Sequence, residues 1–198
     1  MILFLLLFTI CQNTANNTEI SWPLTPFPQA GLQLTAIGAF GMQRPVRPAV
    51  PAHLHTGIDI KRNGGYDNDV FIYPVAKGKV ISKRDDGPYA QLISEHNIAG
   101  LKFWTVYEHI AGIMVNVADS VYPHIPVARF MNREELNRYG WQFDHFHLEI
   151  LKIQPIRIKA EPGNPQRFYS SYSLEMYSID DLNKYYYNPI EFLNQHIH

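Results

Sequence analysis

The 198-residue sequence has a single cysteine, little net charge and no long basic run. One cysteine excludes an intrachain disulfide and a zinc site built from several thiolates. The 17 basic and 18 acidic side chains nearly balance, which argues against nucleic acid or an anionic membrane surface as the main partner. Long stretches with a helical period are also missing. If the protein binds a metal, histidines and carboxylates must supply the ligands.

The composition is that of a folded globular chain. Hydrophobic residues make up 46% and aromatic residues 13% of the sequence, which suffices for a packed core and excludes general disorder. A chain of this length is expected to form one domain. Nine histidines are many for this length, so their positions are the first place to look for chemistry.

The first residues have the pattern of a leader. Met1 to Ile10 form an uninterrupted apolar run, MILFLLLFTI, followed by the polar stretch QNTANNTE. The run has the character of a signal-peptide core and is too short to span a bilayer, which needs roughly 20 residues, so no transmembrane helix is expected. Cys11 directly after the run suggests lipidation, and a buried N-terminal strand is the alternative. We therefore assign residues 1–17 to a signal peptide or lipoprotein leader and residues 18–198 to the folded domain.

The remaining chain has a β-rich pattern. Proline and glycine recur at short intervals, and short apolar or alternating runs lie between them. Strands are expected over Leu32 to Ile37, Gly57 to Lys61, Val70 to Tyr73, Lys79 to Arg84, Ala90 to His96, Leu101 to Ile110 and His145 to Ile153. Short helices are expected after Asn132, with Glu135 completing a capping box and Gly140 ending the helix after Tyr139, after Ser178 with Asp181, and from Asn188-Pro189 through Asn194.

The segment DHFHLEI alternates strictly between polar and apolar residues. In a strand, His145, His147 and Glu149 project from one face, and the apolar residues between them project from the other. Two interpretations are open at this point: the imidazoles belong to a metal or catalytic site, or they decorate a solvated face of the sheet.

The segment HLHTGIDI places His55 and Asp59 four residues apart, with Gly57 permitting a tight backbone path between them. Imidazole and carboxylate are both good zinc ligands. The alternative is a turn with two unrelated polar side chains. His53 would share a strand face with His55, but it has no carboxylate at the same offset.

A third segment, TVYEHI, is expected to place Tyr107 and His109 on one strand face. Two histidines and one carboxylate around a zinc ion leave a position for water, whose pKa the metal lowers to about 7. Hydrolysis then needs a group that takes the proton from water, and His145 and His109 could do so from either side. Glu108 is the rival base, but in a strand it points away from the face of His109.

In this arrangement the sequence resembles the lysostaphin-like, or LytM-domain, zinc metallopeptidases, which cut peptide cross-links in bacterial peptidoglycan. Six segments follow the family's motifs in order between residues 38 and 193: FGMQR for F-G-x-R, HTGID for H-x-G-x-D, VAKGKV for A-x-x-G-x-V, YEH for Y-x-H, HFHLE for H-L-H-F-E, and NPIEFL for D-P-x-x-Y-L. The resemblance implies that His55, Asp59 and His147 bind one Zn²⁺ per chain. It also implies that His109 and His145 form the catalytic pair. The implied fold is mainly β, with an antiparallel sheet of the lysostaphin-like (duplicated hybrid motif) type that floors a groove, and a few short helices.

Departures from the family surround the expected groove. ELNRYGWQFD replaces the Gly-rich G-x-T-G-P turn, with Asp144 in place of proline, and Asp144 either orients a histidine or ligand or caps a loop. More residues than usual separate HLEI from NPIEFL, which predicts an insertion near residues 155–187 that forms a flap beside the groove. Trp104, Trp141 and the tyrosines of residues 169–187 either line the groove or belong to the core.

The resemblance therefore implies an exported zinc metalloendopeptidase of the cell envelope that hydrolyses peptide cross-links of peptidoglycan. Its partners are then stem or cross-bridge peptides, with Cys11 as a candidate lipid anchor, no nucleic acid and a monomeric state. The first alternative is a non-catalytic LytM-type module that binds peptidoglycan or activates an amidase. Such modules typically lack metal ligands, whereas this sequence retains all three. A zinc hydrolase with another substrate is the second alternative.

Overall fold

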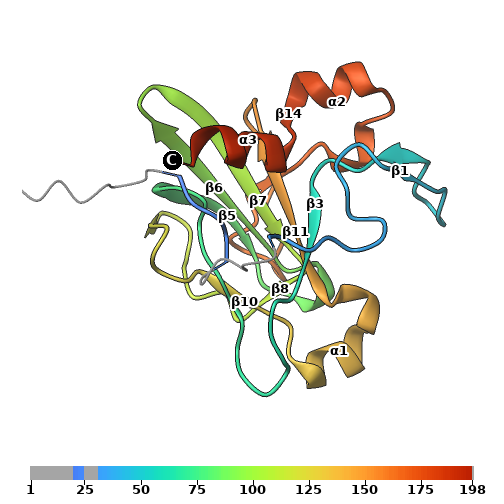
Figure 1. Cartoon of the computed structure of the whole chain (residues 1–198), viewed down its shortest axis with the longest axis vertical. Helices are drawn as coiled ribbons and strands as arrows, with labels where there is room; N and C mark the ends of the chain where they lie inside the picture. Colours follow the sequence, from blue (N-terminus) through green and yellow to red (C-terminus); the bar gives the residue numbers. More distant parts are fainter. Residues whose placement is uncertain (1–19, 25–30, 198) are drawn as a thin grey trace, which may run out of the picture.

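The computed structural model describes residues 20–24 and 31–197. The predicted leader over residues 1–17, with Cys11, lies outside the described residues. Within the described part of the chain, an antiparallel sheet dominates and short helices flank it (Figure 1). The prediction of a mainly β, antiparallel fold with a few short helices is confirmed.

The elements are short apart from four strands of the large sheet. The strands are β1 Gln43–Arg44, β2 His53–Leu54, β3 Ile58–Lys61, β4 Phe71–Ile72, β5 Gly78–Arg84, β6 Gln91–Ile98, β7 Leu101–Glu108, β8 Ile110–Ala111, β9 Ser120–Val121, β10 Ala128–Phe130, β11 His145–Leu151, β12 Ile156–Arg157, β13 Tyr169–Ser170 and β14 Tyr186–Tyr187. The helices are α1 Arg133–Tyr139, α2 Ile179–Tyr185 and α3 Pro189–His196, and single 3₁₀ turns are η1 Gly87–Tyr89, η2 Trp141–Phe143 and η3 Ser173–Glu175.

The large sheet has the order β14-β11-β7-β6-β5-β9, and β3 pairs with β11 off this path. β7 pairs along one side of β11, whereas β3 pairs with residues 145–148 and β14 with residues 150–151 of β11 on the other side. The smaller sheets are β4-β10-β8, β1-β2 and β12-β13. β11 is therefore paired on both sides at His147, whereas among the described strands His145 is paired with β3 alone.

The two faces of the large sheet bury different clusters. Phe146, Leu148 and Ile150 of β11 belong to the larger cluster, together with Phe192 and Leu193 of α3. Figure 1 accordingly shows α3 lying across the strands of this sheet. On the other face a smaller cluster contains Leu151 and Val106 of the sheet, Leu182 of α2 and Tyr186 of β14. Because side chains alternate between faces, β11 directs its histidines to the side of the smaller cluster.

The predicted helices are present, with the predicted caps. Asn132 accepts a hydrogen bond from the amide of Glu135 at 2.9 Å, and the Glu135 carboxylate accepts one from the amide of Asn132 at 2.7 Å, which completes the capping box of α1. The hydroxyl of Ser178 caps α2, and Asn188 caps α3, which runs two residues beyond its predicted end. Short helices near the end of the chain thus follow from local sequence signals.

The prediction of a strand over Leu32 to Ile37 is wrong. Only Leu34 pairs, in an isolated bridge with Ile60. The amide of Gly38 donates to the carbonyl of Thr35 at 3.0 Å, so residues 35–38 form a turn beside β3 where a continuous strand was expected. The alternating apolar residues there pack on the core without forming a ladder.

The predicted strand from Leu101 to Ile110 is interrupted at His109. β7 ends at Glu108, and His109 has a φ angle of +60°, in the left-handed region that residues other than glycine rarely adopt. The expectation that Tyr107 and His109 share a face is therefore wrong. Tyr107 is fully buried in the larger cluster, where its hydroxyl accepts a hydrogen bond from the amide of Val75 at 2.9 Å.

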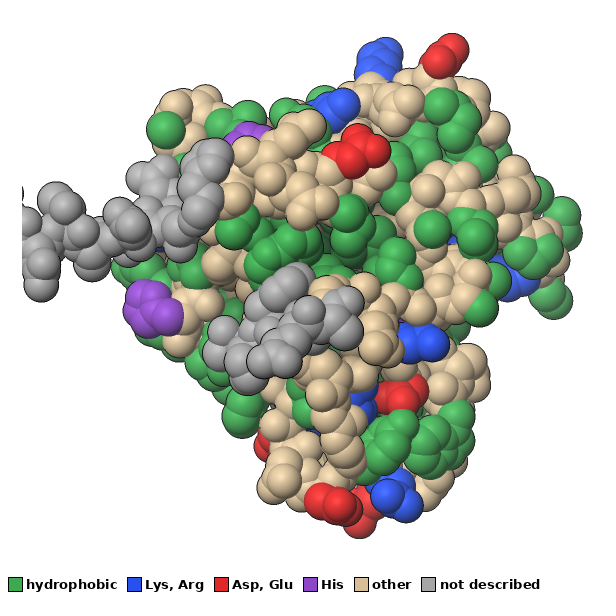
Figure 2. Space-filling view, in the orientation of Figure 1, with side chains coloured by type: hydrophobic (Ala, Val, Ile, Leu, Met, Phe, Trp, Pro, Cys, Tyr) green, Lys and Arg blue, Asp and Glu red, His purple; other side chains and the backbone are tan. Residues whose placement is uncertain are grey.

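The visible surface mixes charges of both signs. Figure 2 shows basic and acidic side chains close together at the two ends of the molecule where α1 and α2 lie. Within residues 20–24 and 31–197, no helix has the length and hydrophobicity needed to cross a membrane.

One histidine outside the expected site is buried in the sheet. His96 of β6 is 1% exposed, and its ring stacks on Phe103 with 4.8 Å between the ring centroids. Its Nε2 lies 2.8 Å from the hydroxyl of Thr105, and its Nδ1 lies 3.1 Å from the carbonyl of Lys77. Burial lowers the pKa of His96 to about 4.

The pKa of His96 predicts a loss of stability in acid. The unfolded chain takes up this proton near pH 6.5, whereas the folded chain takes it up only near pH 4, so the free energy of unfolding falls as the pH decreases between these values. We expect about 3 kcal/mol to be lost at pH 4 through this residue. Urea unfolding of the parent and of His96→Gln at pH 7 and pH 4 measures the difference. His124→Gln, which removes an exposed histidine, is the control, and an equal loss in parent and His96→Gln would contradict the prediction.

Candidate metal centre

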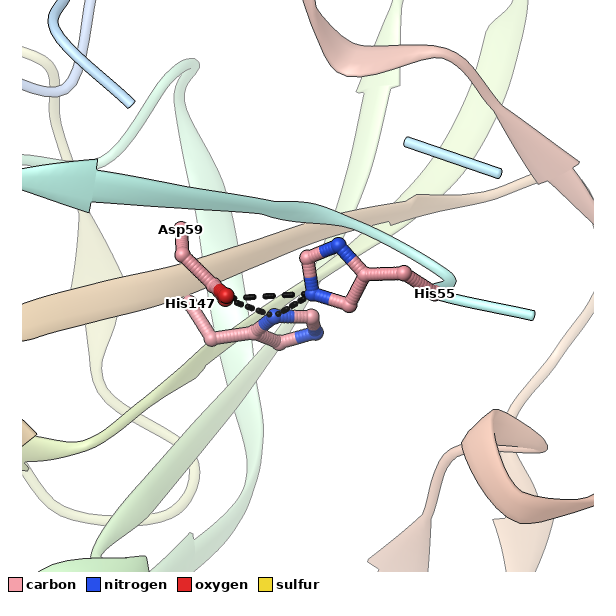
Figure 3. Close-up of side chains that lie close together, drawn as sticks. All are labelled: His55, Asp59 and His147. Carbon is pink, nitrogen blue, oxygen red and sulfur yellow. Dashed lines mark hydrogen bonds and ion pairs between the residues drawn. The ribbon is translucent and has the colours of Figure 1, made fainter. Parts of the chain in front are cut away.

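Three side chains from two segments converge on the groove side of the sheet. Asp59 lies on β3 and His147 on β11, and the register of these strands places the two residues directly opposite each other. His55 precedes β3 and reaches the same point from the turn that leads into the strand. Figure 3 shows the three side chains pointing toward one another.

The distances within this group are short. Nδ1 of His147 lies 2.9 Å from Oδ1 of Asp59 and 2.9 Å from Nε2 of His55, and Nε2 of His55 lies 3.1 Å from Oδ1 of Asp59. The residues are only 5% (His55), 4% (Asp59) and 7% (His147) exposed. Two imidazole nitrogens and one carboxylate oxygen thus occupy positions from which they could hold one metal ion.

Hydrogen bonds on the outer side of each ring decide which nitrogen faces inward with a lone pair. Nδ1 of His55 lies 2.9 Å from the carbonyl of Ala39, which only accepts, so Nδ1 carries the proton and Nε2 presents its lone pair. Nε2 of His147 lies 3.1 Å from the carboxylate of Glu149, so Nδ1 of neutral His147 presents its lone pair to the same point. With His147 neutral, three acceptor atoms face one another, and either a proton or a metal ion must lie between them. The donor set therefore fits zinc.

Further contacts fix the two carboxylates. Nη2 of Arg44 on β1 donates to Oδ2 of Asp59 at 2.6 Å, which leaves Oδ1 for the inward position. The hydroxyl of Thr56 donates to Oε1 of Glu149 at 2.5 Å. Oε2 of Glu149 is buried without a hydrogen-bond partner in the described structure. Outer contacts of this kind orient metal ligands and raise their basicity.

The turn before β3 requires glycine. A Cβ atom on Gly57 would overlap the carbonyl of Leu148 and lie 2.8 Å from Cε1 of His147. A Cβ atom on Gly38 would lie 2.8 Å from Cβ of Asp59. Glycine at these two positions lets neighbouring backbone approach two of the candidate ligands closely.

The group shares a proton when no metal is bound. Burial by itself lowers the pKa of His147, but hydrogen bonds with Asp59 and Glu149 outweigh burial and raise it to about 10. Burial by itself raises the pKa of Asp59, but its contacts with His147 and His55 hold it far below its usual range. Burial lowers the pKa of His55. Metal binding at these atoms would therefore release a proton.

The two predicted catalytic histidines lie beside this group. Nε2 of His145 is 3.8 Å from Oδ1 of Asp59, and the rings of His145 and His109 are 5.1 Å apart, edge to face. Nδ1 of His109 lies 2.6 Å from the carbonyl of Pro88, so its Nε2 presents the lone pair. Burial lowers the pKa of His109, and it lowers the pKa of His145 to about 4. Both rings are therefore neutral near pH 7.

All five predicted site residues line one cavity of about 720 Å³. Glu108 lines it too, so the expectation that Glu108 points away from His109 is wrong. Glu108 lies opposite His147 in the register of β7 and β11, and directly opposed residues share a face. The positive φ angle of His109 breaks the alternation, which brings two consecutive side chains into the same cavity.

Other residues singled out in the sequence have different places. Asp144 does not hydrogen-bond to a histidine within the described chain: it accepts from Nε of Arg62 at 3.1 Å and from the hydroxyl of Tyr66. Trp104 is buried in the smaller cluster, and Trp141 is half exposed outside the large cavity. From residues 169–187, serines and one leucine, not tyrosines, line the cavity: Ser170, Ser171, Ser173 and Leu174.

Glu149 and Arg44 contact the candidate ligands, but no role at the site was predicted for either from the sequence. Glu149 could have been found, because it shares the alternating face with His147 and follows it by two positions. Arg44 is part of the FGMQR segment, but its contact with Asp59 depends on how β1 and β2 fold back beside the site. Strand periodicity alone gives no signal for that contact.

No family model matches this sequence, and a search of curated proteins finds no significant match. Among solved structures, a chain of the SpoIIIAH and SpoIIQ complex is 16% identical, with a TM-score of 0.49 over 87% of this chain and 99% of that chain. Lysostaphin is 16% identical, with a TM-score of 0.47 over 83% of this chain and 51% of that chain. A zinc-containing peptidase from Vibrio cholerae is 24% identical, with a TM-score of 0.45 over 65% and 35%. This chain thus spans about half of the lysostaphin chain and about a third of the Vibrio peptidase chain.

The convergent donor set predicts zinc binding. We expect the full chain to bind close to one zinc ion, and His147→Ala to lower the affinity at least about 100-fold because one of three ligands is lost. Metal analysis after dialysis and a competition titration with a chelator measure both values. His53→Ala is the matched control, because His53 is also buried and lines the same cavity but lies outside the group. Equal zinc in all three proteins would refute this assignment.

Loss of the Glu149 carboxylate, which contacts His147 from outside the candidate ligand group, is predicted to lower zinc affinity less than loss of His147 does. Glu149→Gln removes the negative charge that faces Nε2 of His147 but leaves every candidate ligand in place. We expect zinc affinity to fall by about 10- to 100-fold. The same competition titration measures it, and circular dichroism checks that the variant is folded. An affinity equal to that of the parent would show that Glu149 does not support the ligand.

Proposed function

We propose that this protein is a zinc-dependent endopeptidase that hydrolyses peptide cross-links of bacterial peptidoglycan. The observation that carries the proposal is the convergence of three acceptor atoms of His55, Asp59 and His147 beside two neutral histidines in one cavity. Zinc, when bound, lowers the pKa of a coordinated water and polarises a substrate carbonyl. A site of this composition is suited to hydrolysis and needs no cysteine nucleophile.

The protein's own residues supply the acid and base. His145 lies next to the candidate ligands, and a neutral imidazole there can accept a proton from the attacking water. His109 presents Nε2 because its Nδ1 is held by the carbonyl of Pro88. Either ring, once protonated, can stabilise the negative charge that develops on the carbonyl oxygen or protonate the leaving amine.

The substrate class is proposed from the sequence motifs together with the cavity. The order and spacing of FGMQR, HTGID, YEH and HFHLE resemble those of peptidoglycan endopeptidases. A cavity of about 720 Å³ has room for several residues of a peptide around the reacting bond. Export to the cell envelope is part of the proposal, because peptidoglycan lies outside the cytoplasm.

A catalytic role for His145 predicts loss of hydrolysis without loss of metal. We expect His145→Ala to retain zinc but to release new amino termini from purified peptidoglycan about 10²- to 10⁴-fold more slowly, as for removal of a general acid or base. His124→Ala, which changes an exposed histidine, should hydrolyse at the parent rate. A parent rate in His145→Ala would exclude this role.

The same assay separates the alternative of a non-catalytic module. Such a module would sediment with insoluble peptidoglycan and release no amino termini even with zinc bound. Release of amino termini that depends on His145 supports the peptidase. Cleavage of other peptides but not of peptidoglycan would support a zinc hydrolase with another substrate.

A further inference from the structure

The lining of the large cavity carries an excess of positive charge. The charged residues that line the cavity, histidines aside, are four arginines and two carboxylates: Arg44, Arg47, Arg84, Arg167, Asp59 and Glu108. Asp59 is neutralised by Arg44 and belongs to the candidate metal centre. Apart from this pair, the lining holds three arginines, Arg47, Arg84 and Arg167, and one carboxylate, Glu108.

Arg167, which lines the cavity, has a hydrogen-bond donor that lacks a partner in the described structure. Its Nε is buried and has no hydrogen-bond partner within the described chain, and its guanidinium forms no ion pair there. A buried donor without a partner is costly. The Arg167 side chain also lines the cavity and makes no side-chain hydrogen bond within the described chain, so its other N–H groups can donate to a ligand acceptor.

The position of Arg167 is fixed by β5. The amide of Lys83 donates to the carbonyl of Gln166 at 3.0 Å, and the hydroxyl of Ser82 accepts from the amides of Phe168 and Tyr169 at 3.0 Å each. The segment that carries Arg167 is thus tied on both sides of this residue to the edge of the large sheet. The backbone that carries the Arg167 side chain is therefore held in place before any ligand binds.

Arg84 adds a second guanidinium nearby. Its Nε donates to Oδ1 of Asp86 at 2.5 Å, and this hydrogen bond, with a smaller contribution from the charge of Arg167, lowers the pKa of Asp86. In the described structure Asp86 forms an ion pair with Arg84 only, so it leaves the charge of Arg167 unbalanced, and it does not line the cavity. The hydroxyls of Ser170 and Ser173, which line the cavity, can add neutral donors.

We propose that the cavity wall formed by Arg167, Arg84 and the serines of residues 170–173 binds a free carboxylate of the substrate peptide while the scissile bond lies at the metal centre. Guanidinium and carboxylate match in charge and in planar geometry, and their hydrogen bonds are stronger than those between neutral groups. The inference rests on the proposed function and deepens it, because it selects peptides that carry an acidic group beside the bond to be cut.

The test compares one peptide in two charge states. Stem peptides released from peptidoglycan are used with their side-chain carboxylate free or converted to the amide, and the Kd of each is measured by isothermal titration calorimetry. Zinc-loaded His145→Ala serves as the background, because slow hydrolysis keeps the bound peptide intact. We expect the amide to bind about tenfold more weakly than the carboxylate. In the same background, Arg167→Gln should bind both forms equally.

Two further variants separate charge from folding. Arg157→Gln removes the same charge from an exposed position on β12 outside the cavity and should keep the tenfold preference. Arg167→Lys keeps the positive charge and should retain part of the preference, which guards against a fold defect in Arg167→Gln. The inference is overturned if neither form binds, if both forms bind the background protein equally, or if Arg167→Gln keeps the full preference.

Failure of the carboxylate-binding wall and failure of the peptidase assignment give different experimental results. A protein that prefers the carboxylate through Arg167 but releases no amino termini from peptidoglycan would retain this binding wall and lose the peptidase assignment. A protein that hydrolyses free and amidated peptides with the same kcat/KM would retain the peptidase assignment and lose the wall. In an active enzyme that uses the wall, Arg167→Gln raises KM for the acidic peptide about tenfold and leaves kcat unchanged.

Discussion

The candidate site depends on the antiparallel register between β3 and β11. This register sets Asp59 opposite His147, and the turn at Gly57 then brings His55 within 3.1 Å of the same carboxylate. Because side chains alternate along a strand, a slip of one residue would move His147 to the opposite face and break the group. Pairing of β11 with β7 on its other side, and the larger cluster beneath it, hold this register.

Holding three acceptor atoms together costs free energy, and the surrounding residues offset that cost. Arg44 balances the charge of Asp59, while the carbonyl of Ala39 and the carboxylate of Glu149 hold the outer protons of the two imidazoles. These contacts orient the two inner nitrogens and the inner carboxylate oxygen toward one point before any metal is present. Without metal, the shared proton on His147 lies between these atoms, and a metal ion that replaces it finds the ligands already oriented.

The sequence predicts those features that depend on neighbouring residues. The alternation in DHFHLEI gave the correct face for His147 and Glu149, and capping residues such as Asn132 gave the helices. The wrong predictions concern tertiary features. Residues 32–37 alternate like a strand, but the chain turns after Leu34, and no local signal marks the pairing of Arg44 with Asp59.

His109 shows why strand periodicity fails at this site. Regular alternation would keep Tyr107 and His109 on one face, so either the tyrosine would leave the core or the histidine would leave the cavity. The left-handed backbone at His109 removes this conflict: Tyr107 stays buried, and His109 turns to the cavity beside Glu108. A residue other than glycine in this conformation costs of order 1 kcal/mol or more. Ala49, Ala99 and Ala118 also adopt it, so the conformation by itself does not mark a functional residue. At His109 its consequence is local, because it places the imidazole in the cavity while Tyr107 stays in the core.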